Sequence, residues 1–208
     1  MNRVIVLFHA LVLVPGVALD AVAQQQARIA ASTRAATAVC SSSSATGRCR
    51  ITDTSEVTVL IEYGQPHARG REVWGTLVPF DSVWRLGANA ATHLITRVPL
   101  TIGGVRIPAG NYTLHLLPTA SASQLIVSDS SGTDMWGVPY PGASRDRARI
   151  PMRSRNLTEN IETLVINLVP SASSTSSGVL SILWGRREYS VDWTAQLSGR
   201  GGAGADGR

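Results

Sequence analysis

Apolar and polar residues alternate along much of the chain between residues 50 and 196, with the two-residue period of β-strands. The segment Val57–Tyr63 is rich in the β-branched residues that favour strands. Tyr112, Leu114 and Leu116 fall on one face of a second expected strand. Further strands are expected at 92–102, 124–128, 147–153, 161–169, 179–184 and 188–193.

Turn-forming residues separate these segments. The sequence Ile102-Gly103-Gly104-Val105 predicts a two-residue hairpin turn with positive φ at both glycines. Short strands at near-regular spacing with such turns are typical of antiparallel sandwiches and barrels. We therefore predict an all-β fold, an antiparallel β-sandwich of jelly-roll-like or meander topology, over residues 50–196.

Tryptophans occupy apolar positions in the last two expected strands. Trp184 alternates with Leu180 and Ile182, so these side chains share one face. Trp193 lies in the same way with Tyr189 and Val191. Both sets are expected to belong to the core.

The first residues have the pattern of a secretory signal peptide. Arg3 precedes the apolar run Val4–Leu19, and Ala21-Val22-Ala23 offers small residues at a cleavage site. This run is shorter than the roughly 20 apolar residues that cross a bilayer, and no later run is long enough. We therefore expect residues 1–23 to be removed, no transmembrane segment, and a periplasmic or extracellular protein.

The segments on either side of the expected domain are polar or Gly-rich. Residues 24–49 consist largely of Gln, Ala, Ser and Thr, which predicts a flexible linker. Cys40 and Cys49 in this linker are expected to form a disulfide in an oxidising exterior. Their spacing fits neither a CxxC redox centre nor a metal clip. Residues 197–208 are expected to be a disordered tail.

The positive charge of the chain comes from arginine alone. Nineteen basic residues against fourteen acidic ones give a net charge of +5, and no lysine is present. Arg145, Arg147, Arg149, Arg153 and Arg155 all occupy odd positions, so a strand would place them on one face. One interpretation is a stripe that binds anions. We favour an edge strand protected by its charges and by the proline at position 151. Nucleic acid is not expected as a partner, because no pattern of interleaved aromatic and basic residues is present.

The densest group of unusual residues lies between Tyr63 and Thr92. It contains Tyr63-Gly64-Gln65-Pro66, Val73-Trp74-Gly75 and the string Trp84-Arg85-Leu86-Gly87-Ala88-Asn89-Ala90-Ala91-Thr92. Downstream follow Ile107-Pro108-Ala109-Gly110-Asn111-Tyr112-Thr113-Leu114, then Trp136-Gly137, Tyr140 and Asp146. Over residues 51–195 the chain resembles the domain-of-unknown-function family 2911. The resemblance implies an exported bacterial protein and brings no established reaction with it.

The chain departs from this family at two positions. Gln65 stands where the family usually has Arg, and Ala90 stands where it usually has Glu. If that Glu is a general acid or base in relatives, this chain cannot perform the same chemistry.

The motif and the downstream block supply the candidate binding residues. An arginine fork suits a carboxylate or phosphate, and tryptophan can stack on a sugar ring or a guanidinium group. The alternative is structural: Arg85 would pair with a buried acid, and Asn89 would hold a corner of the sandwich. The candidates are Arg71, Trp84, Arg85, Asn89, Thr92, Tyr140 and Asp146.

Catalytic and metal-binding patterns are weak. His67, His93 and His115 lack the short spacing of metal ligands, so no metal or other cofactor is expected. No Gly-x-Ser-x-Gly nucleophile motif is present, and no pair of acids stands out. We therefore expect an exported, non-enzymatic binding or structural domain that recognises a small molecule or envelope component. The alternative is a hydrolase of envelope glycans or lipids with Asp146 or another acid as its base. Oligomeric state stays open.

Overall fold

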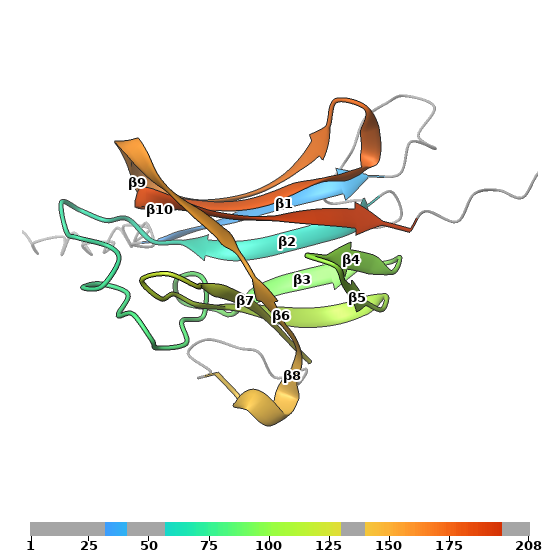
Figure 1. Cartoon of the computed structure of the whole chain (residues 1–208), viewed down its shortest axis with the longest axis horizontal. Helices are drawn as coiled ribbons and strands as arrows, with labels where there is room; N and C mark the ends of the chain where they lie inside the picture. Colours follow the sequence, from blue (N-terminus) through green and yellow to red (C-terminus); the bar gives the residue numbers. More distant parts are fainter. Residues whose placement is uncertain (1–31, 41–56, 130–139, 197–208) are drawn as a thin grey trace, which may run out of the picture.

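The fold is an antiparallel β-sandwich, as the hydrophobic pattern predicts (Figure 1). The computed structural model describes residues 32–40, 57–129 and 140–196. The expected signal peptide, Cys49, Trp136 and the expected C-terminal tail lie outside these residues. No described residue belongs to an apolar helix of membrane-spanning length.

The larger sheet has six strands in the order β1-β2-β3-β6-β7-β8. It follows the chain as a meander, apart from one hairpin that leaves for the second sheet between β3 and β6. Of the two predicted topologies, jelly-roll-like and meander, the structure has the meander. Its strands are β1 (Thr33–Cys40), β2 (Val57–Gln65), β3 (Thr92–Thr96), β6 (Gly110–Leu117), β7 (Gln124–Asp129) and β8 (Asp146–Pro151).

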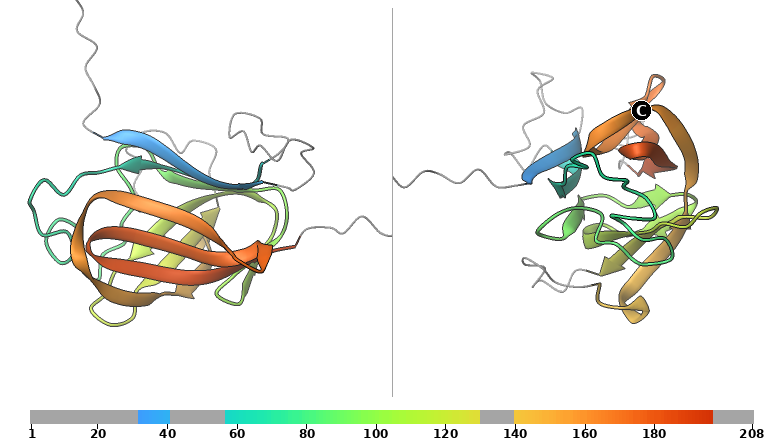
Figure 2. Two further views of the ribbon diagram at one scale, coloured as in Figure 1. Left: turned by 90° about the horizontal axis from the view of Figure 1, so that it is seen from above. Right: turned by 90° about the vertical axis from the view of Figure 1, so that its left-hand side faces the viewer.

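The smaller sheet has four strands in the order β5-β4-β10-β9. Viewed from above, its β9–β10 ribbon lies over β6 and β7 (Figure 2). A short 3₁₀ turn, η1 (Ala143–Arg145), precedes β8. The four strands are β4 (Leu100–Ile102), β5 (Val105–Ile107), β9 (Arg153–Ser171) and β10 (Ser174–Ala195).

Sequence alternation places the core between the two sheets. Tyr112, Leu114 and Leu116 of β6 are all buried, as expected. They meet Trp184 and Trp193 of β10, which are also buried. The predicted core faces of the last strands are therefore confirmed.

The predicted Gly-Gly hairpin is confirmed between β4 and β5. Ile102 pairs with Val105, and Gly103 and Gly104 have φ of 53° and 84°. Positive φ at both central residues is what this type of turn requires, and glycine adopts it without strain. A Cβ at Gly103 would lie 2.5 Å from Cγ2 of Ile150 on β8, so this turn packs closely against the larger sheet.

The flexible-linker prediction for residues 24–49 is wrong for Thr33–Cys40. These residues form β1, which pairs antiparallel with β2 along its whole length. Apolar and polar residues do not alternate in this segment, so its sequence does not indicate a strand. The strand forms because the backbone groups along this edge of β2 need partners, and because Val39 is buried against the core. The sandwich therefore begins before residue 50.

Other strand boundaries also differ from the prediction: the expected strand 147–153 divides at Met152 between β8 and β9, and the expected strand 161–169 is part of the longer β9. The expected strand 92–102 divides into β3 and β4, because the chain leaves the larger sheet around Pro99, which lacks a backbone donor. The segments 179–184 and 188–193 belong to one strand, β10, interrupted by register shifts on both sides of Gly185. The sequence suggested that the strand ends between residues 184 and 188. A bulge in the pairing accommodates these residues instead, so β10 continues to pair with β9 beyond them.

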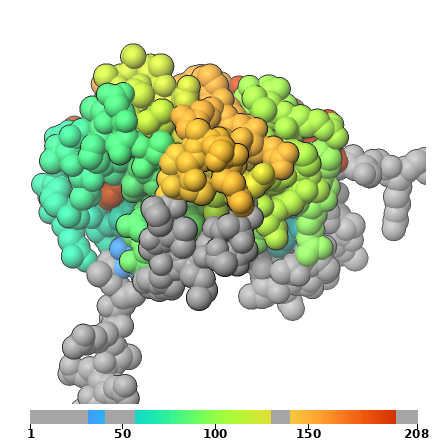
Figure 3. All heavy atoms as spheres, turned by 90° about the horizontal axis from the view of Figure 1, so that it is seen from below, coloured from blue at the N-terminus to red at the C-terminus, as the bar shows by residue number. Residues whose placement is uncertain are grey.

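The chain passes from one sheet to the other at Met152, between β8 and β9. β8 is an edge strand of the larger sheet, and Arg147 and Arg149 point outward while Ala148 and Ile150 are buried. This confirms the predicted charged edge strand for Arg147 and Arg149, but Arg145 lies in η1 and Arg153 and Arg155 lie on β9 of the smaller sheet, so the five arginines do not share one strand. Seen from below, η1 and β8 lie between the teal 66–91 segment and the green strands β4 to β6 (Figure 3).

The other side of the sandwich is joined by hydrogen bonds from the free edge of β9. The backbone N–H of Leu164 donates to the carbonyl of Pro66, at 3.0 Å. The N–H of Ile166 donates to the Tyr63 hydroxyl at 3.0 Å, and that of Leu168 to the Thr37 hydroxyl at 3.2 Å. An open edge would present these donors to other chains, so β1, β2 and the residue after it satisfy β9 from within the molecule.

Candidate ligand-binding site

The loop between β2 and β3, residues 66–91, is long but fixed to the sandwich at several points. The indole Nε1 of Trp74 donates to the carbonyl of Trp184 at 2.8 Å. Trp84 exchanges two backbone hydrogen bonds with Leu116, both at 2.8 Å. Long ordered loops of this kind often carry function, because a rigid scaffold positions their side chains.

Aromatic rings anchor the loop from beneath. Trp74 contacts the rings of Trp84, Trp184 and Tyr189 edge-on, with centroids 5.9, 6.3 and 4.9 Å away. Trp84 stacks on Trp184 at 5.5 Å. These contacts hold Trp74 in one place, with 8% of its surface exposed.

A bulge of β9 opposite Gly185 of β10 sets the opposite side of the site: four residues of β9 lie between Asn156 and Ile161, where β10 has Arg186 alone between Arg187 and Gly185. Gly185 has a φ of 58°, and a Cβ there would lie 3.0 Å from Cγ2 of Val73 in the loop. Successive side chains of a regular strand point to opposite faces, but the bulge lets both Arg186 and Arg187 line the same cavity. Glycine at this position therefore allows the close approach of the loop and turns two arginines toward it.

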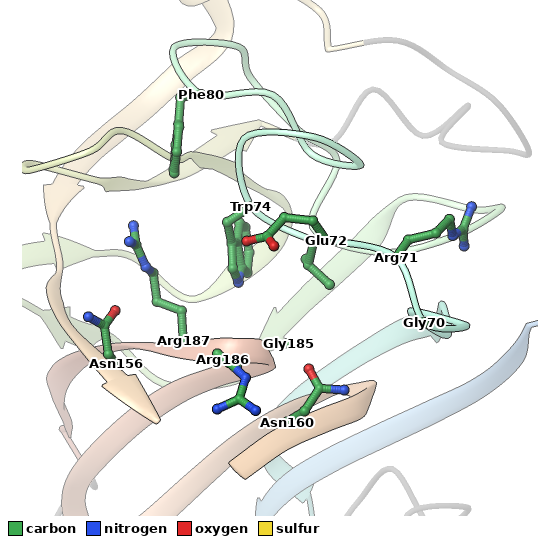
Figure 4. Close-up of a pocket in the computed structure, with 11 residues that line it drawn as sticks. Gly70, Arg71, Glu72, Trp74, Phe80, Asn156, Asn160, Gly185, Arg186 and Arg187 are labelled. Carbon is green, nitrogen blue, oxygen red and sulfur yellow. The ribbon is translucent and has the colours of Figure 1, made fainter. Parts of the chain in front are cut away.

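Between the loop and the β9–β10 ribbon lies a cavity of about 550 Å³ (Figure 4). This volume is within the range of roughly 300–1,000 Å³ found for small-molecule sites. Its lining residues are Gly70, Arg71, Glu72, Val73, Trp74, Phe80, Asn156, Asn160, Gly185, Arg186 and Arg187.

Arg187 is the arginine best placed to meet a ligand. Its guanidinium lies over the Phe80 ring at 5.5 Å and near the Tyr189 ring at 6.0 Å. It donates to the Tyr189 hydroxyl at 3.4 Å, and no carboxylate of the described residues lies within ion-pair distance. The aromatic contacts position the guanidinium while leaving most of its N–H donors for a ligand.

The other two arginines of the cavity are engaged with backbone carbonyls. Arg71 donates to the carbonyls of Ala68 and His67, at 2.8 and 3.0 Å, and points away from the cavity centre (Figure 4). Arg186 donates to the carbonyl of Thr158 at 2.9 Å. They contribute positive charge to the site, whereas Arg187 offers free donors.

Three further polar side chains line the cavity. Asn156 lies opposite Arg187 in the β9–β10 ladder, and Asn160 follows on β9. Glu72 comes from the loop, and its carboxylate points toward the space beside Trp74 (Figure 4). Within the described parts of the chain, none of these three side chains has a hydrogen-bonding partner that would occupy it. Their donors and acceptors are thus open to a ligand.

The motif Trp84–Thr92 organises the loop and lies behind the cavity. The buried Thr92 hydroxyl donates to the carbonyl of Leu86 at 2.9 Å, and Leu86 itself is fully buried with a φ of 54°. Arg85 donates to the carbonyl of Asn89, whose φ is 63°, at 3.4 Å. Of the seven candidates, the structure places only Arg71 in the cavity lining. Asn89 holds a corner, as the structural alternative expected, but Arg85 bonds to a carbonyl where that alternative expected a buried acid.

Tyr140 and Asp146 form a separate polar cluster beside β8. The Tyr140 hydroxyl donates to Oδ2 of Asp146 at 2.6 Å, and the Ser128 hydroxyl donates to Oδ1 at 3.0 Å. Arg149 donates to the same carboxylate and to the Tyr140 hydroxyl, at 2.7 and 2.8 Å. Burial and the hydrogen bond with Asp146 raise the pKa of Tyr140. Both oxygens of the Asp146 carboxylate accept hydrogen bonds, so this cluster fixes the segment that leads into β8.

Four of the five arginines of the stripe, all except Arg145, pair with acids among the described residues. Arg147 pairs with Asp129 at 2.8 Å and Arg149 with Asp146 at 2.7 Å. The pairs Arg153–Asp192 and Arg155–Glu188 follow on β9. Hydrogen bonds from Arg153 lower the pKa of Asp192, which keeps that carboxylate charged as a partner. The paired arginines are consistent with edge protection, whereas Arg187, like Arg71, Arg85 and Arg186, has no carboxylate partner among the described residues.

His67 lies beside β9, whereas His93 and His115 lie on the neighbouring strands β3 and β6. Nδ1 of His67 lies 2.9 Å from the Thr163 hydroxyl, His93 is on β3, and the buried His115 packs edge-on against Tyr140 at 5.0 Å. Residues 32–40, 57–129 and 140–196 contain no cluster of His, Cys, Asp or Glu with metal-site geometry.

Sequence reasoning missed Glu72, Phe80, Asn156, Asn160, Arg186 and Arg187 as site residues. One signal was present: Gly185-Arg186-Arg187 interrupts an apolar strand pattern with two adjacent charges. A glycine within a strand often marks a bulge or a close backbone approach, and such bulges occur next to binding sites.

The fold and the cavity define a β-sandwich domain with a polar, arginine-containing pocket at one end of its two sheets. Residues 44–193 match the model of a protein family described as protein of unknown function (DUF2911). The chain belongs to this family, which confirms the resemblance seen in the sequence. No curated protein and no solved structure matches the chain.

Proposed function

We propose that this chain is an exported, non-enzymatic binding protein whose pocket takes a small anionic ligand. The observation that carries the proposal is Arg187, held over Phe80 in a cavity of about 550 Å³ with no carboxylate partner among the described residues. A half-buried guanidinium with free donors favours a carboxylate or phosphate, which it can bind in a bidentate manner.

The cavity favours this proposal over the hydrolase. A hydrolase of glycans would need two acids, or an acid and a histidine, near the bond to be cleaved. The described lining offers Glu72 as its carboxylate and no histidine. Asp146 bonds to Tyr140, Ser128 and Arg149 and lies outside the cavity lining.

Replacing Arg187 with glutamine tests the proposal. The wild-type full-length mature chain should bind at least one member of an anion panel (phosphate, sulfate, citrate and sugar acids) in isothermal titration. Arg187→Gln should weaken that binding at least tenfold, since charge-assisted hydrogen bonds contribute about 1.5–3 kcal/mol. Arg187→Lys should restore part of it, because the charge returns without the planar fork.

Arg106→Gln is the matched control. Arg106 is exposed on β5, donates to Gln196 at 2.7 Å and lies outside the pocket, so its loss removes one positive charge elsewhere. Thermal melting of each variant establishes that it is folded. Absence of binding to every anion, or equal weakening in both glutamine variants, would refute a pocket centred on Arg187.

Export is the second part of the proposal, supported by the apolar run and small-residue site at residues 4–23. Expressed with its leader in a bacterium, the protein should be recovered outside the cytoplasm with Gln24 as its first residue. A Cys40–Cys49 disulfide would make the intact mass lower by two thiol hydrogens, as mass spectrometry before and after reduction can show. Recovery of the uncut chain in the cytoplasm would contradict export.

A further inference from the structure

The cavity holds two opposite charges that do not pair with each other. Arg187 and Glu72 both line it, and no ion pair joins them or links either one to another described residue. The Glu72 side chain extends from the loop toward the side of the cavity where Arg187 lies (Figure 4). One charge of each sign is therefore open to a ligand.

The surrounding structure holds these two charges at separate points of the cavity. The carbonyl of Glu72 accepts from the N–H of Leu77 at 3.2 Å, and the carbonyl of Val73 accepts from the N–H of Val78 at 2.7 Å. This turn fixes the backbone that carries the Glu72 carboxylate. The Arg187 guanidinium belongs to β10 and is placed by its contact with the Phe80 ring at 5.5 Å.

The two charged groups require opposite partners in a ligand. A guanidinium only donates and suits a carboxylate, whereas a carboxylate only accepts and suits an ammonium group. The side-chain carbonyls of Asn156 and Asn160 add acceptors for further ammonium hydrogens, and their amides add donors. A plain anion would match Arg187 but would be repelled by Glu72, so a ligand with one charge leaves one of the two groups unmatched.

We infer that the ligand is a small zwitterion of the amino-acid type, whose carboxylate binds Arg187 and whose ammonium group binds Glu72. This inference rests on the proposed function, because the carboxylate is the anion that the pocket takes. A cavity of about 550 Å³ accommodates a molecule of this size. The ammonium group supplies the selectivity over simple carboxylic acids.

Matched pairs of small molecules test the inference in isothermal titrations of the mature chain. Glycine, β-alanine, γ-aminobutyrate and ε-aminocaproate carry both charges at increasing separation, and acetate, propionate, butyrate and caproate lack the ammonium group. At least one amino acid should bind at least about tenfold more tightly than its matched acid, because it gains a charge-assisted hydrogen bond to Glu72. Binding of every plain acid as tightly as its matched amino acid would overturn the inference while the proposed anion pocket stands.

Glu72→Gln gives an independent test, because it removes the charge and keeps the shape of an exposed side chain. This variant should weaken binding of the preferred amino acid at least about tenfold and leave binding of the matched acid unchanged or tighter. Glu159→Gln is the control: Glu159 is exposed on β9 and outside the cavity lining, so its replacement should change neither.

The outcomes separate this inference from the proposed function. Equal weakening of amino-acid binding by Glu72→Gln and Glu159→Gln, or no weakening by Glu72→Gln, would overturn the inference. Binding of phosphate with no binding of any amino acid would overturn it too but leave the proposed function. No binding of any anion or amino acid would overturn both.

Discussion

Replacing Trp184 with alanine is expected to lower the free energy of unfolding by about 3–5 kcal/mol, the usual range for a large aromatic side chain removed from a core. Trp184 is 1% exposed, stacks on Trp84 and meets Trp74 edge-on. Its indole also donates to the Glu162 carbonyl at 3.1 Å. That carbonyl keeps a second donor, the N–H of Ala68 at 2.8 Å, so the loss is mainly one of packing.

Urea denaturation followed by far-ultraviolet circular dichroism measures this loss without depending on tryptophan fluorescence. Val169→Ala is the control from the same sheet, because Val169 is 52% exposed and its truncation should change stability by less than about 0.5 kcal/mol. A loss below about 1 kcal/mol for Trp184→Ala would mean that the aromatic cluster is not the centre of the core. Ligand affinity should fall in the same variant, since Trp74 loses its support.

Gly64→Ala is the second substitution for which a large effect is expected. A Cβ at Gly64 would lie 1.9 Å from the carbonyl oxygen of Ala88 and 2.8 Å from its carbonyl carbon. Backbone atoms cannot rotate away as a side chain can, so β2 or the 66–91 loop must shift. The N–H of Ala88 also donates to the Gly64 carbonyl at 3.1 Å, and this bond would be lost with the shift. Overpacking typically costs about 1–3 kcal/mol, and a clash with backbone should reach at least about 3 kcal/mol.

Gly70→Ala separates this clash from the ordinary effect of adding a methyl group. Gly70 lies in the same loop with a φ of 70°, and nothing lies within 4 Å of a Cβ placed there. Only left-handed strain of about 1–2 kcal/mol is expected. Limited proteolysis within residues 84–91 should increase in Gly64→Ala and not in Gly70→Ala. Equal stability and equal cleavage of the two variants would argue against the close contact of β2 with the motif.

Strict alternation made some elements of the fold predictable. In β6 the apolar residues recur every second position, although the polar residues between them are buried as well, and in β8 the arginines and the buried residues alternate. The Gly103-Gly104 turn was predictable because its backbone geometry excludes most other residues. β1 was not, since its Ala and Thr residues carry no alternation, and the strand forms because β2 and β9 need partners on that side.

The site was harder to predict for a different physical reason. Gly87 and Asn89 signal unusual backbone in a sequence, and the structure shows that Asn89 has left-handed geometry and that a Cβ at Gly87 would meet the Thr92 hydroxyl at 2.9 Å. Such residues shape a loop without having to touch a ligand. The pocket instead joins residues 70–80 of the loop to residues 156–160 of β9 and 185–187 of β10, which follow much later in the chain. Their meeting depends on the register of β9 against β10, and the bulge opposite Gly185 sets that register.

The position of β1 has a consequence for where this domain can be cut. The family match begins at residue 44, after β1 has ended at Cys40. A fragment trimmed to the match would leave the outer ladder of β2 open and remove the Thr37 hydroxyl that accepts from Leu168. Open edges of this kind can add strands from other molecules. Thr33–Cys40 therefore acts as a donor strand tethered in cis, and without it the domain would be expected to recruit that strand from a second molecule.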